Sequence, residues 1–304
     1  MKGKISAVIT AFNEESKIED CLKSVRFCDE IILIDAESRD NTVNIVKKYK
    51  AKVFSRKNNP MLNVNKNFGF SKASNKWILS LDSDERVSDG LREEILGILE
   101  NDANKINGYY IPRRNYIFGK WVKYTGWYPD FQLRLFRNGK GKFEEKHIHE
   151  MIKIDGKTDY LKSDILHLNY ENISQFLKKT ESYTQNEAEQ LLSAGYVFDW
   201  KDCLRMPVKE FLSRFFAREG YKDGLHGLIL SLLMAFYHLI IFAKIWENTK
   251  FEEYSSGNFL KETGSELSKI RRELSFWFKK AKMDNIRNPI NKNLQRLINK
   301  LTGN

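Results

Sequence analysis

The sequence predicts an α/β domain with a largely parallel sheet and helices on both faces, followed by a helical, basic extension. Three observations predict it: strand and helix patterns alternate early in the chain, polar residues follow where the strands end, and a long apolar segment lies at 224–246. The chain has 304 residues, and single hydrophobic cores stop growing at about 250 residues, so the chain is long enough for one α/β domain and an extension. We therefore place the α/β domain at residues 1–193 and the extension at 194–304.

Apolar periodicity predicts the elements of the α/β domain in order. A strand begins at Ile5 and breaks into the polar turn AFNEE. Four apolar residues then share one face of a helix: Ile18, Cys21, Leu22 and Val25. Further strands are predicted at 30–34, 52–55 and 77–81, with a helix at 65–73 before the last of them. This succession is typical of parallel strands joined by helical crossovers.

Spaced carboxylates close the last of these strands. Asp82-Ser83-Asp84 follows the apolar run WILSL, and Glu85 comes next. A buried strand that ends this way presents hard oxygen ligands at the carboxyl edge of the sheet, where open α/β folds bind ligands. The arrangement suits a divalent ion that carries a diphosphate.

Composition limits the class of protein. The three cysteines, Cys21, Cys28 and Cys203, lack metal-ligand spacing and are expected to be structural thiols in a reducing cytoplasm. The first residues lack the plan of a signal peptide. The net charge is +11, and residues 250–304 hold twelve Lys or Arg against six Asp or Glu. Without zinc-finger spacing or an RNP string, this charge favours an anionic membrane surface over nucleic acid as partner.

The extension contains segments with two or more interpretations. The apolar segment 224–246 is long enough for a helix of about 35 Å, and it can lie in a membrane interface, span the membrane or be buried in protein. An amphipathic helix is predicted at 173–192. The segment VKEFLSRFFAREGY opens after Met206-Pro207 and mixes phenylalanines with basic residues, so its aromatics either face an interface or pack on the first domain.

Several motifs in order resemble one enzyme family. The turns AFNEE and IDAESRDNT, the helix KNFGFSKA and the turn LDSDE are similar to those of inverting family 2 glycosyltransferases of GT-A fold, whose Rossmann-like sheet is mixed. The later strings WYPDFQLRLFRNGKGKF and HIHE resemble the lipopolysaccharide-core glucosyltransferases of that family. The resemblance covers roughly residues 4–183.

The resemblance implies a nucleotide-sugar site with a metal ion. It places two groups of donor-binding residues in this sequence: Thr10, Phe12, Glu14 and Asp35 around the base and ribose, and Lys66 and Asn67 near the uracil and phosphates. It implies that Asp84 binds Mg²⁺ or Mn²⁺ directly, with Asp82 on the ribose or on a metal-bound water. Lys66 can equally be a solvated helix lysine, and Asp40 is expected to be the N-cap of a helix.

The base that deprotonates the acceptor hydroxyl is expected to be Asp130. It lies in GWYPDFQLRLF between aromatics, where burial would raise its pKa. Many members of the family carry a pair of acids here, and this chain has a single aspartate, so Glu150 is the reserve candidate.

Further polar residues are assigned to phosphate or acceptor contact. Arg134 and Arg137 are expected to meet phosphate, or else to pair with surface acids. His149 is expected near the metal or diphosphate, His147 in packing, and His167 in the core.

Together these features predict a metal-dependent transfer of a hexose at the cytoplasmic face of a bacterial-type membrane. The donor is expected to be a UDP-hexose and the acceptor a cell-envelope saccharide or a lipid-linked one. Two other functions stay open: a sugar-phosphate nucleotidyltransferase, which would need a Gly-rich loop where AFNEE stands, and a non-catalytic scaffold at the membrane.

Overall fold

The computed structural model describes residues 3–59, 61–101, 105–145 and 150–285. The chain divides into two compact units, the first made of Met1–Trp121 and Trp127–Glu171 and the second of Val122–Gly126 and Asn172–Asn304. The main division between the units therefore falls after residue 171, whereas the sequence analysis placed it after residue 193. Helix α5 (Ile173–Ser193) belongs to the second unit because it packs against helix α7 (Leu225–Asn248).

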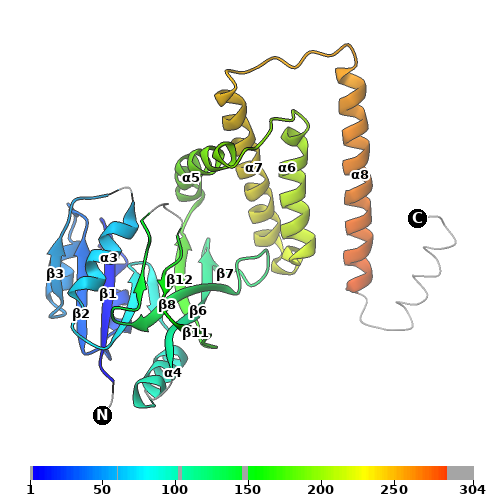
Figure 1. The fold of residues 1–304 in the computed structure, drawn as a ribbon. Coiled ribbons are helices and arrows are strands. Elements are labelled where there is room, and N and C mark those ends of the chain that lie inside the picture. The colour runs from blue at the N-terminus through cyan, green and yellow to red at the C-terminus, as the bar shows by residue number, and fades with distance from the viewer. Residues whose placement is uncertain (1–2, 60, 102–104, 146–149, 286–304) are drawn as a thin grey trace. The chain divides into compact units, whose positions relative to one another are not determined.

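A mixed sheet with the order β3-β2-β1-β4-β8-β6-β12-β5 forms the centre of the first unit (Figure 1). Its strands are β1 (Ile5–Ala11), β2 (Glu30–Asp35), β3 (Lys52–Ser55), β4 (Trp77–Asp82), β5 (Glu85–Val87), β6 (Ile106–Ile117), β8 (Asp130–Arg137) and β12 (Ile165–Tyr170). Strands β7 (Lys120–Trp121) and β11 (Lys157–Tyr160) also pair with β6, and β9 (Gly141–Lys142) pairs with β10 (Lys153–Ile154).

Strands β1 to β4 are parallel, as predicted, but β8 runs antiparallel to both of its neighbours and β5 antiparallel to β12. The sheet is therefore mixed, which confirms the fold class that the family resemblance implied and corrects the largely parallel sheet expected from the strand pattern alone.

Helices cover both faces of this sheet. One face packs on α1 (Ile18–Ser24), α2 (Thr42–Lys47) and α4 (Asp89–Glu100), and the other on α3 (Leu62–Lys72). Strand β1 serves both, since Ile9 enters the first core and Val8 the second. Helix α3 lies so close that a Cβ on Gly69 would be 2.6 Å from Val8 Cγ1. Burial on both faces explains the continuous apolar runs of the sequence.

The register of the parallel strands gathers polar residues at one edge. Thr10 pairs with Asp82 between β1 and β4, and the next residue, Ala11, pairs with Asp35 at the end of β2. Three strand ends thus meet at the carboxyl edge of the sheet, the place where open α/β folds bind ligands.

The second unit is helical. It contains α5, α6 (Asp202–Phe211), a π-helical turn at Leu212–Ala217, a 3-10 turn at Gly220–Asp223, α7 and α8 (Phe259–Asp284). The helix expected to open after Pro207 begins earlier, with Pro207 inside it. Helix α7 is long and apolar enough to cross a membrane, and 28% of its most apolar window is buried in the protein.

Candidate active site

The turns after β1 and β2 are tied to each other by side chains. Asn13, at φ 54°, accepts a hydrogen bond from Arg39 N at 2.8 Å through its Oδ1. Asp40 accepts one from Glu15 N at 3.0 Å and one from Thr42 Oγ1 at 2.6 Å. These are local contacts within the turn, and the N-cap position of α2 is occupied by Asn41, not by Asp40 as predicted. The two polar turns therefore form one fixed rim beside the carboxyl edge.

The residues predicted to line the base and ribose pocket lie along this rim. Thr10 Oγ1 is 3.5 Å from Asp82 Oδ1, and Asp35 is buried and accepts a hydrogen bond from Ser38 N at 3.2 Å. Phe12 presents an exposed ring in the turn after β1, and Glu14 N donates to Thr42 Oγ1 at 2.8 Å. The structure brings Thr10, Asp35 and Asp82 to the same edge.

Alternating charged side chains continue from this edge across the sheet as a chain of ion pairs, which we call the charge ladder: Lys66, Asp82, Arg134, Glu85, Arg113 and Asp130. Asp82 lies 2.6 Å from both Lys66 Nζ and Arg134 Nη2. The same Arg134 nitrogen is 2.7 Å from Glu85 Oε1, and Arg113 Nη1 is 3.3 Å from that oxygen. Arg113 Nε then donates to Asp130 Oδ2 at 2.8 Å.

Two cations of the ladder stabilise the ionised form of Asp82. Burial disfavours a charged Asp82, but Arg134 and Lys66 outweigh burial and hold the pKa of that carboxyl well below its usual range. Because each of its oxygens faces a protein cation, Asp82 is arranged as an anchor for Lys66 and Arg134. Glu85 is fully buried and was not assigned a role from the sequence.

Asp130 differs from its prediction in one respect. Burial does act to raise its pKa, but Arg113, Gln132 and Asn115 stabilise the charged form and the pKa is lowered. The expected upward shift is wrong because the carboxylate faces a guanidinium across the β6–β8 pair, where Arg113 is its register partner. Asp130 is therefore an ionised carboxylate at neutral pH.

His167, which the sequence placed in the core, lies beside Asp84. Its Nε2 is 3.5 Å from Asp84 Oδ2, and its Nδ1 is 2.6 Å from Asn115 Oδ1. Asn115 uses its Nδ2 to donate to Trp127 O at 2.7 Å, so its oxygen faces the histidine and Nδ1 carries the proton. His167 Nε2 and Asp84 Oδ2 therefore face each other, a nitrogen and an oxygen of the kinds that bind divalent cations.

His167 reaches the site because of how β12 pairs with its neighbouring strands, and the sequence alone does not show that pairing. His167 pairs with Asn115 in β6 and with Glu85 in β5, so β12 carries it into the site between two polar strands. In the described residues no group of three or more His, Cys, Asp and Glu side chains is arranged to hold a metal. Asp84 and His167 are the pair from which such a site can be built.

The remaining predicted residues are placed differently. Asn67 donates to Phe143 O at 2.9 Å and to Glu145 Oε1 at 2.7 Å, so it holds the segment after β9. Glu150 accepts a hydrogen bond from Glu145 N at 2.8 Å, and His149, with His147, lies outside the described residues.

Arg137 lies at the opposite end of β4 from Asp82. It stacks its guanidinium over Trp77 at 4.5 Å and donates to Ile106 O at 2.9 Å. Trp77 is the first residue of β4 and Asp82 the last, so phosphate contact by Arg137 at this site is not supported.

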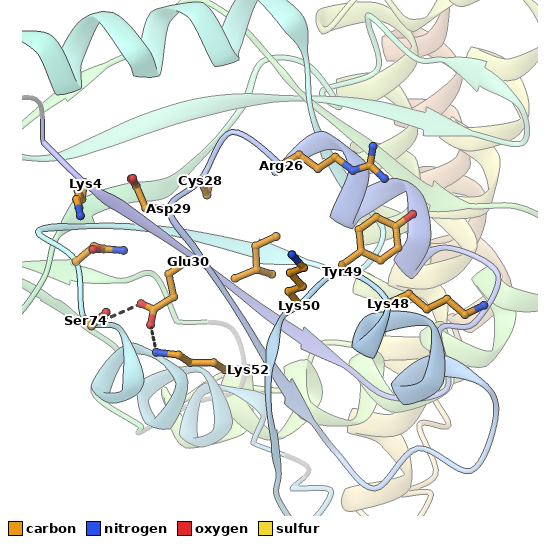
Figure 2. A pocket seen from close by; sticks show the side chains of 12 residues that line it. Lys4, Arg26, Cys28, Asp29, Glu30, Lys48, Tyr49, Lys50, Lys52 and Ser74 are labelled. Atoms are coloured by element: carbon orange, nitrogen blue, oxygen red, sulfur yellow. Dashed lines mark hydrogen bonds and ion pairs between the residues drawn. The ribbon is translucent and has the colours of Figure 1, made fainter.

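A polar cavity of about 520 Å³ lies at the other edge of the sheet, near the amino ends of β1, β2 and β3 (Figure 2). Glu30 lines it and accepts hydrogen bonds from Lys52 Nζ at 2.6 Å and Ser74 N at 2.9 Å. Burial acts against its charge, yet these partners and Ser6 lower the pKa of Glu30 to about 2. None of the residues predicted for the site lines this cavity.

Comparison with known proteins identifies the family. Residues 6–156 match the sequence model described as Glycosyl transferase family 2. The chain is 28% identical over 257 residues to the lipopolysaccharide core biosynthesis glycosyltransferase LpsC of Rhizobium meliloti, covering 81% of this chain and 93% of that protein. It is 27% identical over 279 residues to an uncharacterized glycosyltransferase of Rickettsia conorii, RC0292, covering 85% of this chain and 98% of that one.

Solved structures give weaker likenesses. A mannosyltransferase of Pyrobaculum calidifontis matches with a TM-score of 0.45 and 12% identity, over 91% of this chain and 84% of that one. TarS 1-349 of S. aureus matches with a TM-score of 0.42 and 16% identity, over 83% of this chain and 93% of that one. TM-scores below 0.5 do not establish a common fold. The family match and the glycosyltransferase relatives do establish that this chain belongs to glycosyltransferase family 2 and is a glycosyltransferase.

Proposed function

We propose that this glycosyltransferase moves a hexose with inversion from a UDP-linked donor to a hydroxyl of a cell-envelope saccharide or lipid-linked acceptor. The observation that carries the proposal is the carboxyl edge of the sheet, where the charge ladder ends and Asp84 lies beside His167. Transfer from a nucleotide diphosphate needs a place for the leaving charge and a base for the acceptor. This edge supplies residues for both.

The donor set at Asp84 and His167 fits a divalent ion. A carboxylate oxygen with an imidazole nitrogen suits Mn²⁺ better than Mg²⁺, which binds mainly oxygen. Such an ion, when bound, stabilises the negative charge on the departing diphosphate. Asn115 orients His167 through Nδ1, and Lys66 and Arg134 hold Asp82 where it can meet the ribose or a water on the metal.

We assign the base role to Asp130. Its carboxylate is ionised at neutral pH and oriented by Arg113, Gln132 and Asn115, so it accepts a proton from a hydroxyl without first losing one. Asn115 also holds His167, which links the orientation of the base to that of the metal ligand. Glu150 stays the reserve candidate.

The acceptor class rests on the relatives. LpsC is described as a lipopolysaccharide core biosynthesis enzyme, and this chain aligns with 93% of it. We therefore propose a saccharide of the cell envelope as acceptor, at the cytoplasmic face of the inner membrane, and no nucleic-acid partner.

A thermal-shift panel tests the donor part of the proposal. UDP, GDP and CMP and their sugars are added with Mn²⁺ or with a chelator. A ligand at ~100 times its dissociation constant stabilises the folded state by about 2.7 kcal/mol. We expect stabilisation by UDP in Mn²⁺ and much less in chelator. If all of these ligands leave unfolding unchanged in saturating metal, the proposal fails and the scaffold function is favoured. Release of pyrophosphate from a nucleoside triphosphate and a sugar phosphate would favour the nucleotidyltransferase.

A further inference from the structure

Helix α7 exposes a continuous apolar face. Six large side chains, each more than a third exposed, follow one another at spacings of three, four and seven residues, and we call them the α7 stripe: Leu225, Ile229, Leu232, Phe236, Leu239 and Trp246. These spacings place them on one side of a helix. Leu225 is 71% exposed and Leu232 is 49% exposed, so the apolar surface extends well along the helix.

The opposite face of α7 is fixed within the second unit. Ile241 and Ile245 pack with Ala188 of α5, and Tyr237 Oη donates to Glu187 Oε2 at 2.8 Å. Lys244 Nζ donates to Glu181 O at 2.7 Å. At the start of the helix a Cβ on Gly227 would lie 1.8 Å from Gly220 O, so the backbones are in contact there. One face of α7 is therefore packed against its own unit, and the α7 stripe lies on the other face.

This packing decides between the three arrangements that the sequence left open. An ordinary core helix would not expose six large apolar side chains in a row. A span would have to carry α5 and α6 into the hydrocarbon as well, with the charges of Glu187 and Glu210 facing α7, which is costly. A helix that lies in the membrane interface places its exposed apolar face in lipid and keeps its other face packed on protein, which agrees with both observations.

We propose that the second unit binds an anionic bilayer surface, with α7 lying in the plane of the interface and the α7 stripe inserted among the lipids. A second copy of this chain fits the stripe less well, because protein interfaces have a polar rim. The half-exposed neighbours of the stripe, Leu228, Leu233 and Ile240, are apolar too. Trp246 near the end of the helix is a residue type enriched at membrane interfaces.

Charge complementarity supports an anionic surface. Between residues 269 and 284 of α8, six basic side chains outnumber two acids, Glu273 and Asp284; the basic residues are Lys269, Arg271, Arg272, Lys279, Lys280 and Lys282. The aromatic rings of Phe276 and Phe278 are exposed among them. Basic residues mixed with exposed aromatics are typical of helices that meet anionic lipid.

Vesicle flotation of the full chain tests the proposal. Vesicles of phosphatidylcholine, with and without phosphatidylglycerol, are compared for wild type, Leu232→Ser/Phe236→Ser, and a control with two exposed apolar residues elsewhere in the unit, Leu177→Ser/Val197→Ser. We expect wild type and control to float with anionic vesicles and the stripe variant to bind at least ~10-fold more weakly. High salt should release wild type only in part, because screening leaves the apolar contact intact. Equal binding by the stripe variant would overturn the proposal.

Two further readouts separate the rival arrangements. Sedimentation without lipid that shows a wild-type dimer and a monomeric stripe variant would assign the stripe to a second copy. A fluorophore on cysteines introduced at 225, 232, 239 and 246 reports depth by quenching with spin-labelled lipid. Equal, shallow depths are expected, whereas a deep centre with shallow ends would mean a span and contradict the proposal. Burial raises the pKa of the Cys21, Cys28 and Cys203 thiols, which slows their labelling.

This inference deepens the membrane location given under the proposed function. Its experiments read vesicle binding and depth without turnover. A negative result here leaves the donor chemistry standing, and an inactive enzyme that still floats with vesicles separates the two in the other direction.

Discussion

Folded proteins usually expose charged side chains and bury large apolar ones, and each of the two units departs from one half of this rule. The first unit buries charge, with Glu85 and Arg134 inside the sheet, and the second exposes apolar surface along α7. Both arrangements are unusual, because buried charges need partners and large exposed apolar patches favour contact with something else. In the first unit the partners are other charges of the same chain. In the second, a partner outside the chain is proposed.

The contrast indicates a different role for each kind of side chain. Paired charges inside a sheet hold side chains in fixed positions, as acid and base chemistry requires. An exposed apolar face positions nothing by itself, but it attaches the protein to a surface. The predictions below address this contrast from the largest expected effect to the smallest.

Removing the negative charge of Asp130 should have the largest effect on catalysis. Asp130→Asn keeps the shape of the side chain but cannot accept the proton, so kcat should fall by ~10²–10⁴-fold, the contribution of one general base. Binding of UDP should stay near wild type. Wild-type turnover in this variant would exclude Asp130 as the base, and Glu150→Gln would then be tested.

Removing the central acid of the charge ladder should have the largest effect on stability. Glu85→Gln leaves Arg134 and Arg113 without the carboxylate between them, and breaking a buried pair costs about 3–5 kcal/mol. Urea unfolding measures it. The matched control is Glu93→Gln, which removes the exposed pair with Arg92 and should cost less than about 1 kcal/mol. Equal costs for both variants would show that the ladder is not a stabilising network.

The pH dependence of stability should show the paired Glu30. Its pKa is lowered to about 2 in the folded protein, so its contribution is present above its unfolded pKa and is lost as pH falls toward 2. Glu30→Gln should therefore cost about 2 kcal/mol at neutral pH, the scale of hydrogen bonds to a charged group. The gap between variant and wild type should narrow between about pH 4.5 and pH 2. A gap that does not change over this range would contradict the assigned shift.

Arg137 should give the smallest effect. Arg137→Gln loses the stacking on Trp77 and should cost about 1 kcal/mol of stability, while the kcat and KM for the donor stay at wild-type values. An increased KM for the donor would restore the phosphate role that the sequence suggested for Arg137.

The sequence predicted the elements well where periodicity is local. Strand β3 begins at Lys52 and ends at Ser55, as predicted, and α5 ends one residue from its prediction. It did not predict α8, whose apolar residues lie mostly exposed and whose basic charge dominated the interpretation.

The sequence analysis found the site residues that lie at strand ends and missed those that the pairing of distant strands brings to the site. Asp82 and Asp130 follow or begin strands next to recognisable turns. Glu85, Arg113 and His167 enter through pairings of β5, β6 and β12, strands that are far apart in sequence. Local pattern contains no information about such pairings, which is why the charge ladder appears only in the structure.

Calorimetric titration of UDP into the protein, with Mn²⁺ or with chelator, tests the central claim most directly. Three proteins are compared: wild type, His167→Ala and His238→Ala. His238 is the matched control because it also lies near a carboxylate, 3.7 Å from Glu210, but in the second unit. We expect wild type and His238→Ala to bind UDP in a Mn²⁺-dependent manner, and His167→Ala to bind it at least ~10-fold more weakly. UDP binding that is equal in all three proteins, or unaffected by chelator, would contradict a metal-assisted donor site at Asp84 and His167.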